Sequence, residues 1–315
     1  MKKKEKAKIS VFVVTIFIVL LAYCASIIFP VVWGFITSLK ASVDFGVLGN
    51  VIGLPDARLS SQELRFANYI RIFKRFTITT GNNSYYSALF GRIEILPQRV
   101  DFLGLVFNTI IYAVLCAIIG SFSNMTIAYL CAKFDCKFSR FWYSLLLVVM
   151  IIPIVGSGPS MLNILRNLGI YDTYISMVIM HYTCGGVYFF VFYACMKGIP
   201  ISFNEAAEID GASQMGIYVR IIIPLASKIL FTVSLISFIA FWNDYQTPLL
   251  YYPSKPTLAY GVYSMSGSTS GGTYDSTSLP QRVAGCMILA TPLIVLFIAC
   301  KNVILGNLSM GGLKE

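Results

Sequence analysis

The chain has 315 residues, of which 57% are hydrophobic and only 12% charged, and its mean hydropathy is +0.75. This composition lies outside the range of soluble domains and predicts an integral membrane protein. The formal charge of +10 does not indicate nucleic-acid binding, because the lysines and arginines stand at the ends of apolar runs. A basic face interleaved with aromatics is missing from the sequence, so the charge is better explained by membrane orientation.

The eight cysteines do not predict a metal site. Most of them lie inside apolar runs, where a thiol behaves as a small hydrophobic group. Cys131 and Cys136 lack the C-x-x-C spacing and have no histidine nearby.

The chain opens with a lysine-rich cytoplasmic segment, residues 1–8, and an apolar run, residues 9–39, that predicts the first transmembrane helix. The run continues well past any signal-peptide cleavage site, and Tyr23 stands where a lipoprotein box needs a small residue. Residues 40–104 follow as a long extracytoplasmic loop. Its basic residues do not contradict that side, since long loops are translocated whatever their charge.

Residues 105–315 form the predicted core, with five further spans. These are expected at Leu105–Leu130, Phe141–Val155, Tyr174–Met196, about Lys228–Leu250 and about Val283–Leu305. Glycines 185 and 186 interrupt the fourth of these six spans. Lysines and arginines after the second and fourth spans place those loops inside, so both termini are cytoplasmic. The fold class is therefore an all-α membrane protein with about six transmembrane helices.

One long polar segment, residues 197–224, separates two apolar runs. Pro200 ends the preceding helix, and Ser202 with Glu205 has the S-x-x-E spacing of a capping box, which predicts a short helix from Ser202. Gly211 predicts a sharp turn. A second short helix is expected through Arg220, with Pro224 at the mouth of the fifth span.

This segment resembles the EAA loop of membrane subunits in ATP-binding-cassette (ABC) importers. The resemblance rests on Glu205-Ala206-Ala207, Asp210-Gly211-Ala212 and Ile223-Pro224-Leu225. The sequence resembles the carbohydrate branch, of the maltose and multiple-sugar type, at Phe241–Tyr245 with Pro248-Leu249, at Asn68-Tyr69, at Asn108-Thr109 and at Met310–Lys314. Thr77 to Arg99 has no match and is treated as an insertion.

The resemblance implies that the loop is a cytoplasmic coupling element, held in a cleft of a separate ATPase subunit. The implied coupling residues are Glu205, Ala206, Ala207, Asp210, Gly211, Gly216 and Pro224. The face formed by Phe203, Ala206 and Ala207 would be inserted in the cleft. An ordinary amphipathic interfacial helix is the alternative.

A substrate path is expected near Trp242, Asn243, Asp244, Tyr245 and Gln246, placed about two thirds of the way across the fifth span. Amide and carboxylate groups beside aromatic rings suit a sugar, whose hydroxyls need donors and acceptors. Helix-to-helix bonding between subunits is an equally open interpretation for Asn243 and Asp244. His181, the only histidine, has no carboxylate at helical spacing and is expected to be a packing residue.

No nucleophile with a base and no phosphate-binding G-x-x-x-x-G-K-[ST] loop is present in the sequence, so the chain is expected to be neither an enzyme nor an ATPase. It needs no cofactor of its own, because ATP is bound by partner subunits.

The implied partners are a homodimeric or heterodimeric pair of ATPase subunits, a second homologous permease subunit, an extracytoplasmic solute-binding protein and membrane lipid. The sequence thus predicts the permease subunit of an ATP-driven importer in a bacterial inner membrane, carrying a sugar or oligosaccharide. An importer for a non-sugar solute and a stand-alone carrier are the alternatives.

Overall fold

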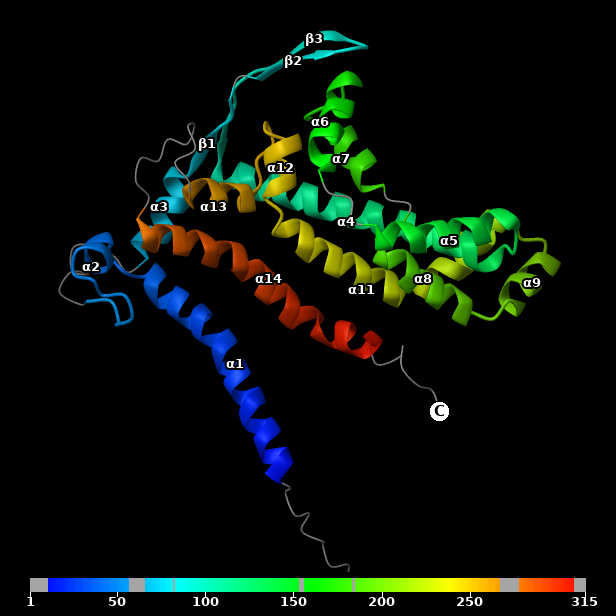
Figure 1. Ribbon diagram of the computed structural model, residues 1–315, viewed down its shortest axis with the longest axis horizontal. Helices are drawn as coiled ribbons and strands as arrows, with labels where there is room; N and C mark the ends of the chain where they lie inside the picture. Colours follow the sequence, from blue (N-terminus) through cyan, green and yellow to red (C-terminus); the bar gives the residue numbers. More distant parts are fainter. Residues whose placement is uncertain are drawn as a thin grey trace, which may run out of the picture. The chain divides into compact units, whose positions relative to one another are not determined.

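The computed structural model describes residues 11–56, 66–81, 83–152, 156–182, 185–266 and 278–308 (Figure 1). The N-terminal residues 1–8 and the tail motif Met310–Lys314 lie outside these ranges. The chain divides into two compact units. The first comprises residues 1–76 and 274–290, and the second comprises residues 77–273 and 291–315.

The first unit contains the predicted first span, which is confirmed as α1 (Val11–Ser38). None of its most apolar stretch is buried, as expected for a helix that faces lipid. A short helix, α2 (Ser42–Gly46), follows, and α3 (Ala67–Arg75) opens with Asn68 and Tyr69. α14 (Leu279–Leu308), the predicted sixth span, begins in this unit and ends in the second.

Side chains from α3 contact the C-terminal end of α1. The Asn68 amide donates to the carbonyl oxygens of Ser38 and Lys40, and the Tyr69 and Ser38 hydroxyls lie 2.6 Å apart. Lys40, only 1% exposed, donates to two carbonyl oxygens of the α2–α3 connection. The last carbonyls of a helix have no partner within it, and the Asn68 amide supplies one for the Ser38 carbonyl.

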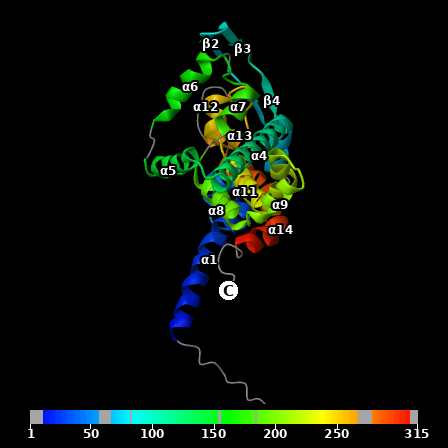
Figure 2. The ribbon, with the colours of Figure 1, turned by 90° about the vertical axis from the view of Figure 1, so that its right-hand side faces the viewer.

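The second unit is built around α4 (Phe102–Lys133), against which α7 (Tyr174–His181), α8 (Val187–Gly198) and α11 (Ile223–Trp242) pack (Figures 1 and 2). Further helices complete this unit. They are α5 (Lys137–Ile151), α6 (Ser157–Asn167), α9 (Ser202–Ile209), α10 (Gln214–Ile217), α12 (Gln246–Tyr251) and α13 (Leu258–Ser266), and a π-helical turn spans Tyr218–Ile222.

The predicted count of six spans is not confirmed. Among the described residues, four helices are long and apolar enough to cross a membrane: Phe12–Ser38, Phe102–Lys133, Gln214–Trp242 and Leu279–Asn302. The third predicted span is the 15-residue α5, about 22 Å long at 1.5 Å per residue and shorter than the roughly 30 Å apolar layer of a membrane. The fourth is divided between α7 and α8, as its two glycines predict. Gly186 has φ +120° immediately before α8.

The insertion, for which the sequence predicted no particular structure, forms two short antiparallel pairs of strands within a mostly helical chain. β1 (Thr77–Thr79) pairs antiparallel with β4 (Arg99–Asp101), and β2 (Asn83–Ser87) pairs antiparallel with β3 (Gly91–Ile95). Side chains at the β2–β3 turn are attached to the end of α6, where the amide of Ala88 and the hydroxyl of Ser87 both donate to the Asn167 carbonyl.

Candidate functional site

The loop predicted to dock an ATPase begins where α8 ends. α8 stops at Gly198, and Pro200 follows with no backbone N–H to continue a helix. α9 then runs at 66° to α8 and begins at Ser202, as predicted.

The predicted capping box is wrong. Ser202 already lies inside α9, and the residue that precedes the helix is Ile201, whose side chain caps nothing. The amides of Asn204 and Glu205 bond instead to the Ile201 carbonyl, at 2.8 and 3.1 Å. Because the helix starts on backbone contacts alone, the Ser202 hydroxyl and the Glu205 carboxylate are not used in a cap.

The turn after α9 is a Schellman motif centred on Gly211. Gly211 has φ +80°, its amide donates to the Glu208 carbonyl, and the Ala212 amide donates to the Ala207 carbonyl. These two bonds satisfy carbonyls at the end of the helix and require a left-handed residue, which glycine adopts without a Cβ clash. Asp210 is the last residue before this turn and is exposed.

A second cap, which the sequence prediction missed, starts the next helix. Ser213 precedes α10, and its hydroxyl accepts a hydrogen bond from the Gly216 amide at 3.2 Å. A Cβ on Gly216 would lie 3.2 Å from the same oxygen, so glycine leaves room for this cap. Serine is a preferred residue directly before a helix, so Ser213 could have been predicted as this cap from the sequence.

The second helix is not separate from the fifth span, which corrects both expected boundaries. α10, the π-helical turn Tyr218–Ile222 and α11 form one helical rod from Gln214 to Trp242, with Pro224 as the second residue of α11. Proline removes one backbone donor and crowds the preceding turn, and the wider π-helical turn lies directly before it. The turn at Gly211 is therefore joined to the full length of this helix.

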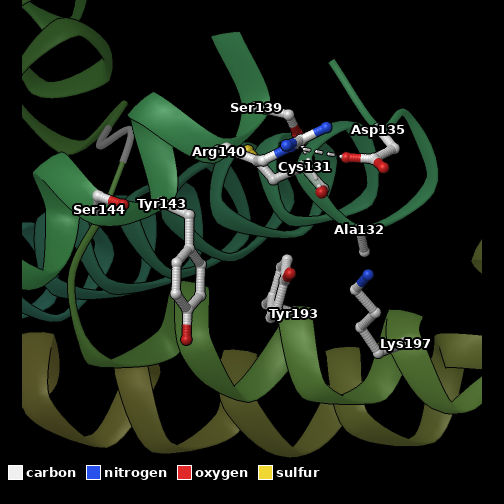
Figure 3. Close-up of a pocket in the computed structure, with 9 residues that line it drawn as sticks. All are labelled: Cys131, Ala132, Asp135, Ser139, Arg140, Tyr143, Ser144, Tyr193 and Lys197. Atoms are coloured by element: carbon white, nitrogen blue, oxygen red, sulfur yellow. Dashed lines mark hydrogen bonds and ion pairs between the residues drawn. The ribbon is translucent and has the colours of Figure 1, made fainter. Parts of the chain in front are cut away.

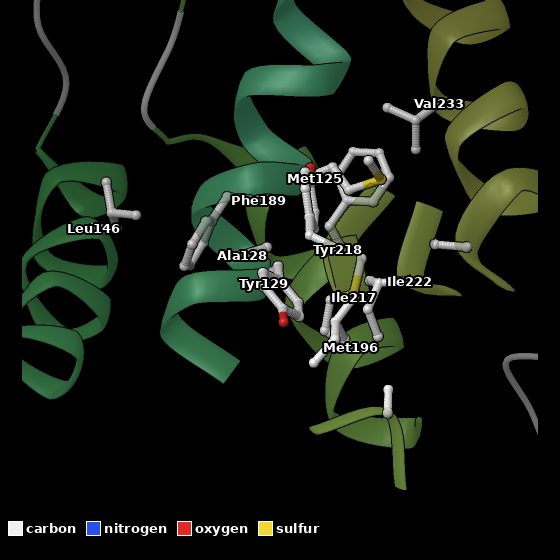
Figure 4. Close-up of a cluster of buried hydrophobic side chains, with 13 residues drawn as sticks. Met125, Ala128, Tyr129, Leu146, Phe189, Met196, Ile217, Tyr218, Ile222 and Val233 are labelled. Carbon is white, nitrogen blue, oxygen red and sulfur yellow. The ribbon is translucent and has the colours of Figure 1, made fainter. Parts of the chain in front are cut away.

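The side of the loop that faces the protein is held by a cluster of buried apolar side chains (Figure 4). Met196, Ala207, Ile217 and Ile222 come from the loop and its flanking helices, and Tyr129 comes from α4. The Asn204 amide also donates to the Tyr129 hydroxyl at 3.3 Å. Ala207 is 8% exposed, so its predicted insertion into a partner is wrong.

The opposite side of α9 is open. Phe203, Glu205 and Ala206 are exposed, and Ile209 is 88% exposed. Among the described residues, none forms a hydrogen bond or ion pair with the Glu205 carboxylate. An apolar surface with one free carboxylate is suited to a protein partner that presents a basic group.

The substrate-path candidates do not lie within a continuous span. α11 ends at the buried Trp242, and the Asn243 amide bonds back to the Ile239 carbonyl of its own helix. Tyr245 stacks on Tyr263 of α13 with ring centres 4.3 Å apart, and Gln246 begins α12. The fifth span, predicted to reach about Leu250, therefore ends earlier, because the helix breaks at Asn243.

Asp244 joins three elements at this break. One carboxylate oxygen accepts the amides of Gln246 and Thr247, both at 3.0 Å, and so caps α12. The other accepts the Tyr112 hydroxyl of α4 at 2.8 Å. The sequence alone gave no sign of Tyr112, which is 132 residues from Asp244. Asp244 therefore bonds to a second helix of this same chain.

His181 packs as expected. Its ring nitrogen Nδ1 lies 2.8 Å from the Met177 carbonyl, one turn back in α7. Its ring meets Tyr112 and Phe241 edge-on, at 5.7 and 4.8 Å between centres. Tyr112 thus lies between His181 and the Asp244 carboxylate.

The segment after α12 is attached to α4 through the predicted Asn108-Thr109 flank. The Asn108 amide donates to the Pro256 carbonyl, and the Thr109 hydroxyl accepts the Leu258 amide at 2.8 Å. α13 is therefore fixed to the start of α4 by these two adjacent residues.

Comparison with known proteins identifies the family. The family model described as "binding-protein-dependent transport system inner membrane component" matches residues 124–309, more than half of the chain. The chain belongs to this family. It is a membrane permease subunit of an ABC importer rather than an enzyme, and its partners are ATPase subunits, a solute-binding protein and a second permease subunit.

Several relatives have named transport systems. The arabinooligosaccharides transport system permease protein AraQ of Halalkalibacterium halodurans is 25% identical over 66% of this chain and 72% of its own length. The trehalose transport system permease protein SugB of Mycobacterium tuberculosis is 23% identical over 90% of this chain and 92% of its own. The melibiose/raffinose/stachyose import permease protein MelC of Bacillus subtilis is 27% identical over 68% and 75%, respectively.

A solved structure shares the fold. A chain in the crystal structure of a bacterial ABC transporter involved in the import of the acidic polysaccharide alginate superposes with a TM-score of 0.70. The match covers 96% of this chain and 99% of the other, with 18% sequence identity. The mainly helical permease fold predicted from the sequence is thereby confirmed.

Proposed function

We propose that this chain forms half of the membrane pore of an importer for a sugar or oligosaccharide, and that α9 is the point at which the ATPase moves it. ATP binds to the partner ATPase subunits, and the chain itself binds no cofactor. The sugar assignment rests on the relatives, whose names specify arabinooligosaccharides, trehalose, and melibiose, raffinose or stachyose.

The observation that carries the coupling proposal is the open side of α9. Glu205 is exposed and without an internal partner among the described residues, while Asn204 and Ala207 attach the other side of the helix to the protein. The Gly211 turn then joins α9 to the continuous helix Gln214–Trp242. A displacement of α9 is therefore transmitted along a helix of 29 residues rather than absorbed in a flexible loop.

The coupling proposal predicts that Glu205→Lys weakens the contact with the ATPase. A contact at the centre of an interface contributes about 2 kcal/mol or more, so we expect at least a 30-fold loss of ATPase affinity. Co-purification of the ATPase and uptake of labelled trehalose and raffinose should both fall, while insertion into the membrane is unchanged. Glu94→Lys, the same charge change on the exposed strand β3, should leave both readouts intact.

Normal uptake by Glu205→Lys would contradict the coupling proposal. The sugar assignment is tested separately in cells that depend on this chain, with labelled glutamine as the non-sugar solute. Uptake of glutamine with no uptake of any offered sugar would overturn the sugar assignment and leave the coupling proposal standing.

A further inference from the structure

A cavity of about 510 Å³ lies between the ends of α4, α5 and α8 (Figure 3). The positive-inside pattern predicts that these helix ends face the cytoplasm. The lining residues that carry polar groups include Asp135, Ser144, Arg140, Tyr143, Tyr193 and Lys197.

The cavity contains more positive than negative charge. The Arg140 Nε atom lies 3.0 Å from a carboxylate oxygen of Asp135, which engages one of the five N–H donors of the guanidinium group. The Lys197 ammonium lies 5.7 Å from the centre of the Tyr193 ring, and no carboxylate among the described residues pairs with it. Two cations therefore face one carboxylate, and a monoanion would balance the charge.

The cavity is also lined by aromatic rings and hydroxyl groups. The rings of Tyr143 and Tyr193 lie 4.7 Å apart, from α5 and α8 respectively, and Ser144 follows Tyr143 in the chain. Apolar residues beside the cavity are exposed, including Phe141 at 60% and Val148 at 54%. The cavity thus combines charged and hydroxyl groups and is adjoined by an exposed apolar surface suited to acyl chains.

We propose that this cavity binds the phosphate group of an anionic phospholipid of the phosphatidylglycerol class. Arg140 and Lys197 would bind the phosphate, and the Tyr143, Tyr193 and Ser144 hydroxyls would bind the glycerol headgroup. Basic pockets between membrane helices at the cytoplasmic surface recognise headgroups of this kind. The same phosphate chemistry fits a soluble glycerol phosphate, and the site is independent of the solute that the importer carries.

Native mass spectrometry of the full chain in detergent tests the site, with phosphatidylglycerol, zwitterionic phosphatidylcholine and sn-glycerol 3-phosphate as three separate probes. We expect tight binding of phosphatidylglycerol over phosphatidylcholine, weakened about fivefold by Arg140→Gln and by Lys197→Gln, because each cation near the surface contributes about that factor. Lys301→Gln, which removes an exposed lysine of α14, should leave binding unchanged. Lys197→Arg, which keeps the charge, should retain it.

The probes also distinguish the two sources of phosphate. Binding of the lipid alone establishes a membrane lipid site, and displacement of the lipid by sn-glycerol 3-phosphate establishes the same phosphate site with a soluble ligand. Equal binding of the two lipids would overturn the proposal, as would phosphatidylglycerol binding that is unchanged in both Arg140→Gln and Lys197→Gln.

Discussion

At the scale of single residues, the Asp244 carboxylate has the most connections of any group near the break between α11 and α12. It caps α12 through two amides and accepts the hydroxyl of Tyr112, which is only 1% exposed. An unsatisfied hydroxyl at a buried position costs free energy, so both partners depend on this bond. Asp244 therefore stabilises the permease whether or not a solute touches it.

We predict that Asp244→Ala lowers the free energy of unfolding by about 2 kcal/mol, since it removes a helix cap and leaves the Tyr112 hydroxyl unpaired. Tyr112→Phe should also destabilise, and the double variant should lose less than the sum of the two because they share one bond. Thermal unfolding in detergent measures each effect, and Tyr86→Phe, at a position that is 76% exposed, is the control. Strict additivity of the two losses would contradict the shared bond.

Asp172 carries a second carboxyl group that is buried in the structure. Its side chain is 2% exposed, and one carboxylate oxygen lies 3.5 Å from the Lys255 ammonium. Its backbone φ is +62°. Burial raises the pKa of Asp172 above its ordinary value, and the nearby Lys255 ammonium only partly opposes this shift. The folded chain therefore holds a proton on Asp172 at a pH where the unfolded chain has released it.

From this shift we predict the pH dependence of stability. Because the pKa of Asp172 is raised in the folded chain, its contribution to the free energy of unfolding is greatest below its ordinary pKa of 3.8. That contribution declines as the pH rises through the raised pKa. The difference in melting temperature between wild type and Asp172→Asn should fall over that interval and then level off. Asparagine suits the test because it tolerates positive φ. A difference that rises with pH would refute the assignment, and Glu94→Gln, on an exposed strand, controls for general acid effects.

At the scale of elements, the coupling segment is a helix, a closed turn and a second, much longer helix. Among the described residues, no atom lies within 4 Å of the position that a Cβ added at Gly211 would occupy. The requirement for glycine at 211 is therefore conformational and does not come from packing. In the coupling mechanism that we propose, this closed turn would carry a displacement of α9 to α11.

We predict that Gly211→Val destabilises the turn by about 1–2 kcal/mol, because a β-branched residue at φ +80° is strained. Insertion should be normal, and ATP hydrolysis should continue with little uptake. Gly198→Ala is the matched control, since it also meets nothing within 4 Å but has no positive φ. Uptake by Gly211→Val at the wild-type level, measured with labelled trehalose, would show that the turn is not needed for coupling.

At the scale of the whole molecule, the charge pattern and the helices together predict which connections between helices face the cytoplasm. The α4–α5 connection carries Cys136, which is exposed, and the β2–β3 turn carries Leu89, which is 67% exposed. Lysines and arginines near the first of these predict that it faces the cytoplasm, and the second belongs to the predicted extracytoplasmic loop.

We therefore predict opposite labelling of these two positions by a membrane-impermeant maleimide. Cys136 should react in inverted vesicles and not in intact cells, and a Leu89→Cys variant should react in intact cells. Mass spectrometry of the labelled peptides measures both, and Cys136→Ser is the control for background reaction. Labelling of both positions from the same side would contradict the orientation.

Much of the fold and part of the site are predictable from local patterns in the chain. The apolar runs predict α1, α4 and α14, and Gly211 predicts its own left-handed turn, since each of these depends on residues close together in the sequence. The S-x-x-E pattern at Ser202 fails, because the chain after Pro200 enters the helix one residue earlier and its amides find backbone carbonyls first. The sequence predicts the start of the fifth span at Pro224, but a π-helical turn precedes this proline and the helix is continuous from Gln214.

The sequence by itself determined that this protein lies in a membrane, that its loop at residues 197–224 has the pattern of an ABC importer, and where the chain turns at Gly211. These properties follow from hydropathy and from backbone preferences that each residue carries with it. Only the tertiary structure decided that Ala207 faces inward, that Asp244 bonds Tyr112, and that the unmatched insertion forms paired strands. Those outcomes depend on which segments far apart in the sequence come into contact. The free energy of such contacts cannot be predicted from a local stretch of sequence.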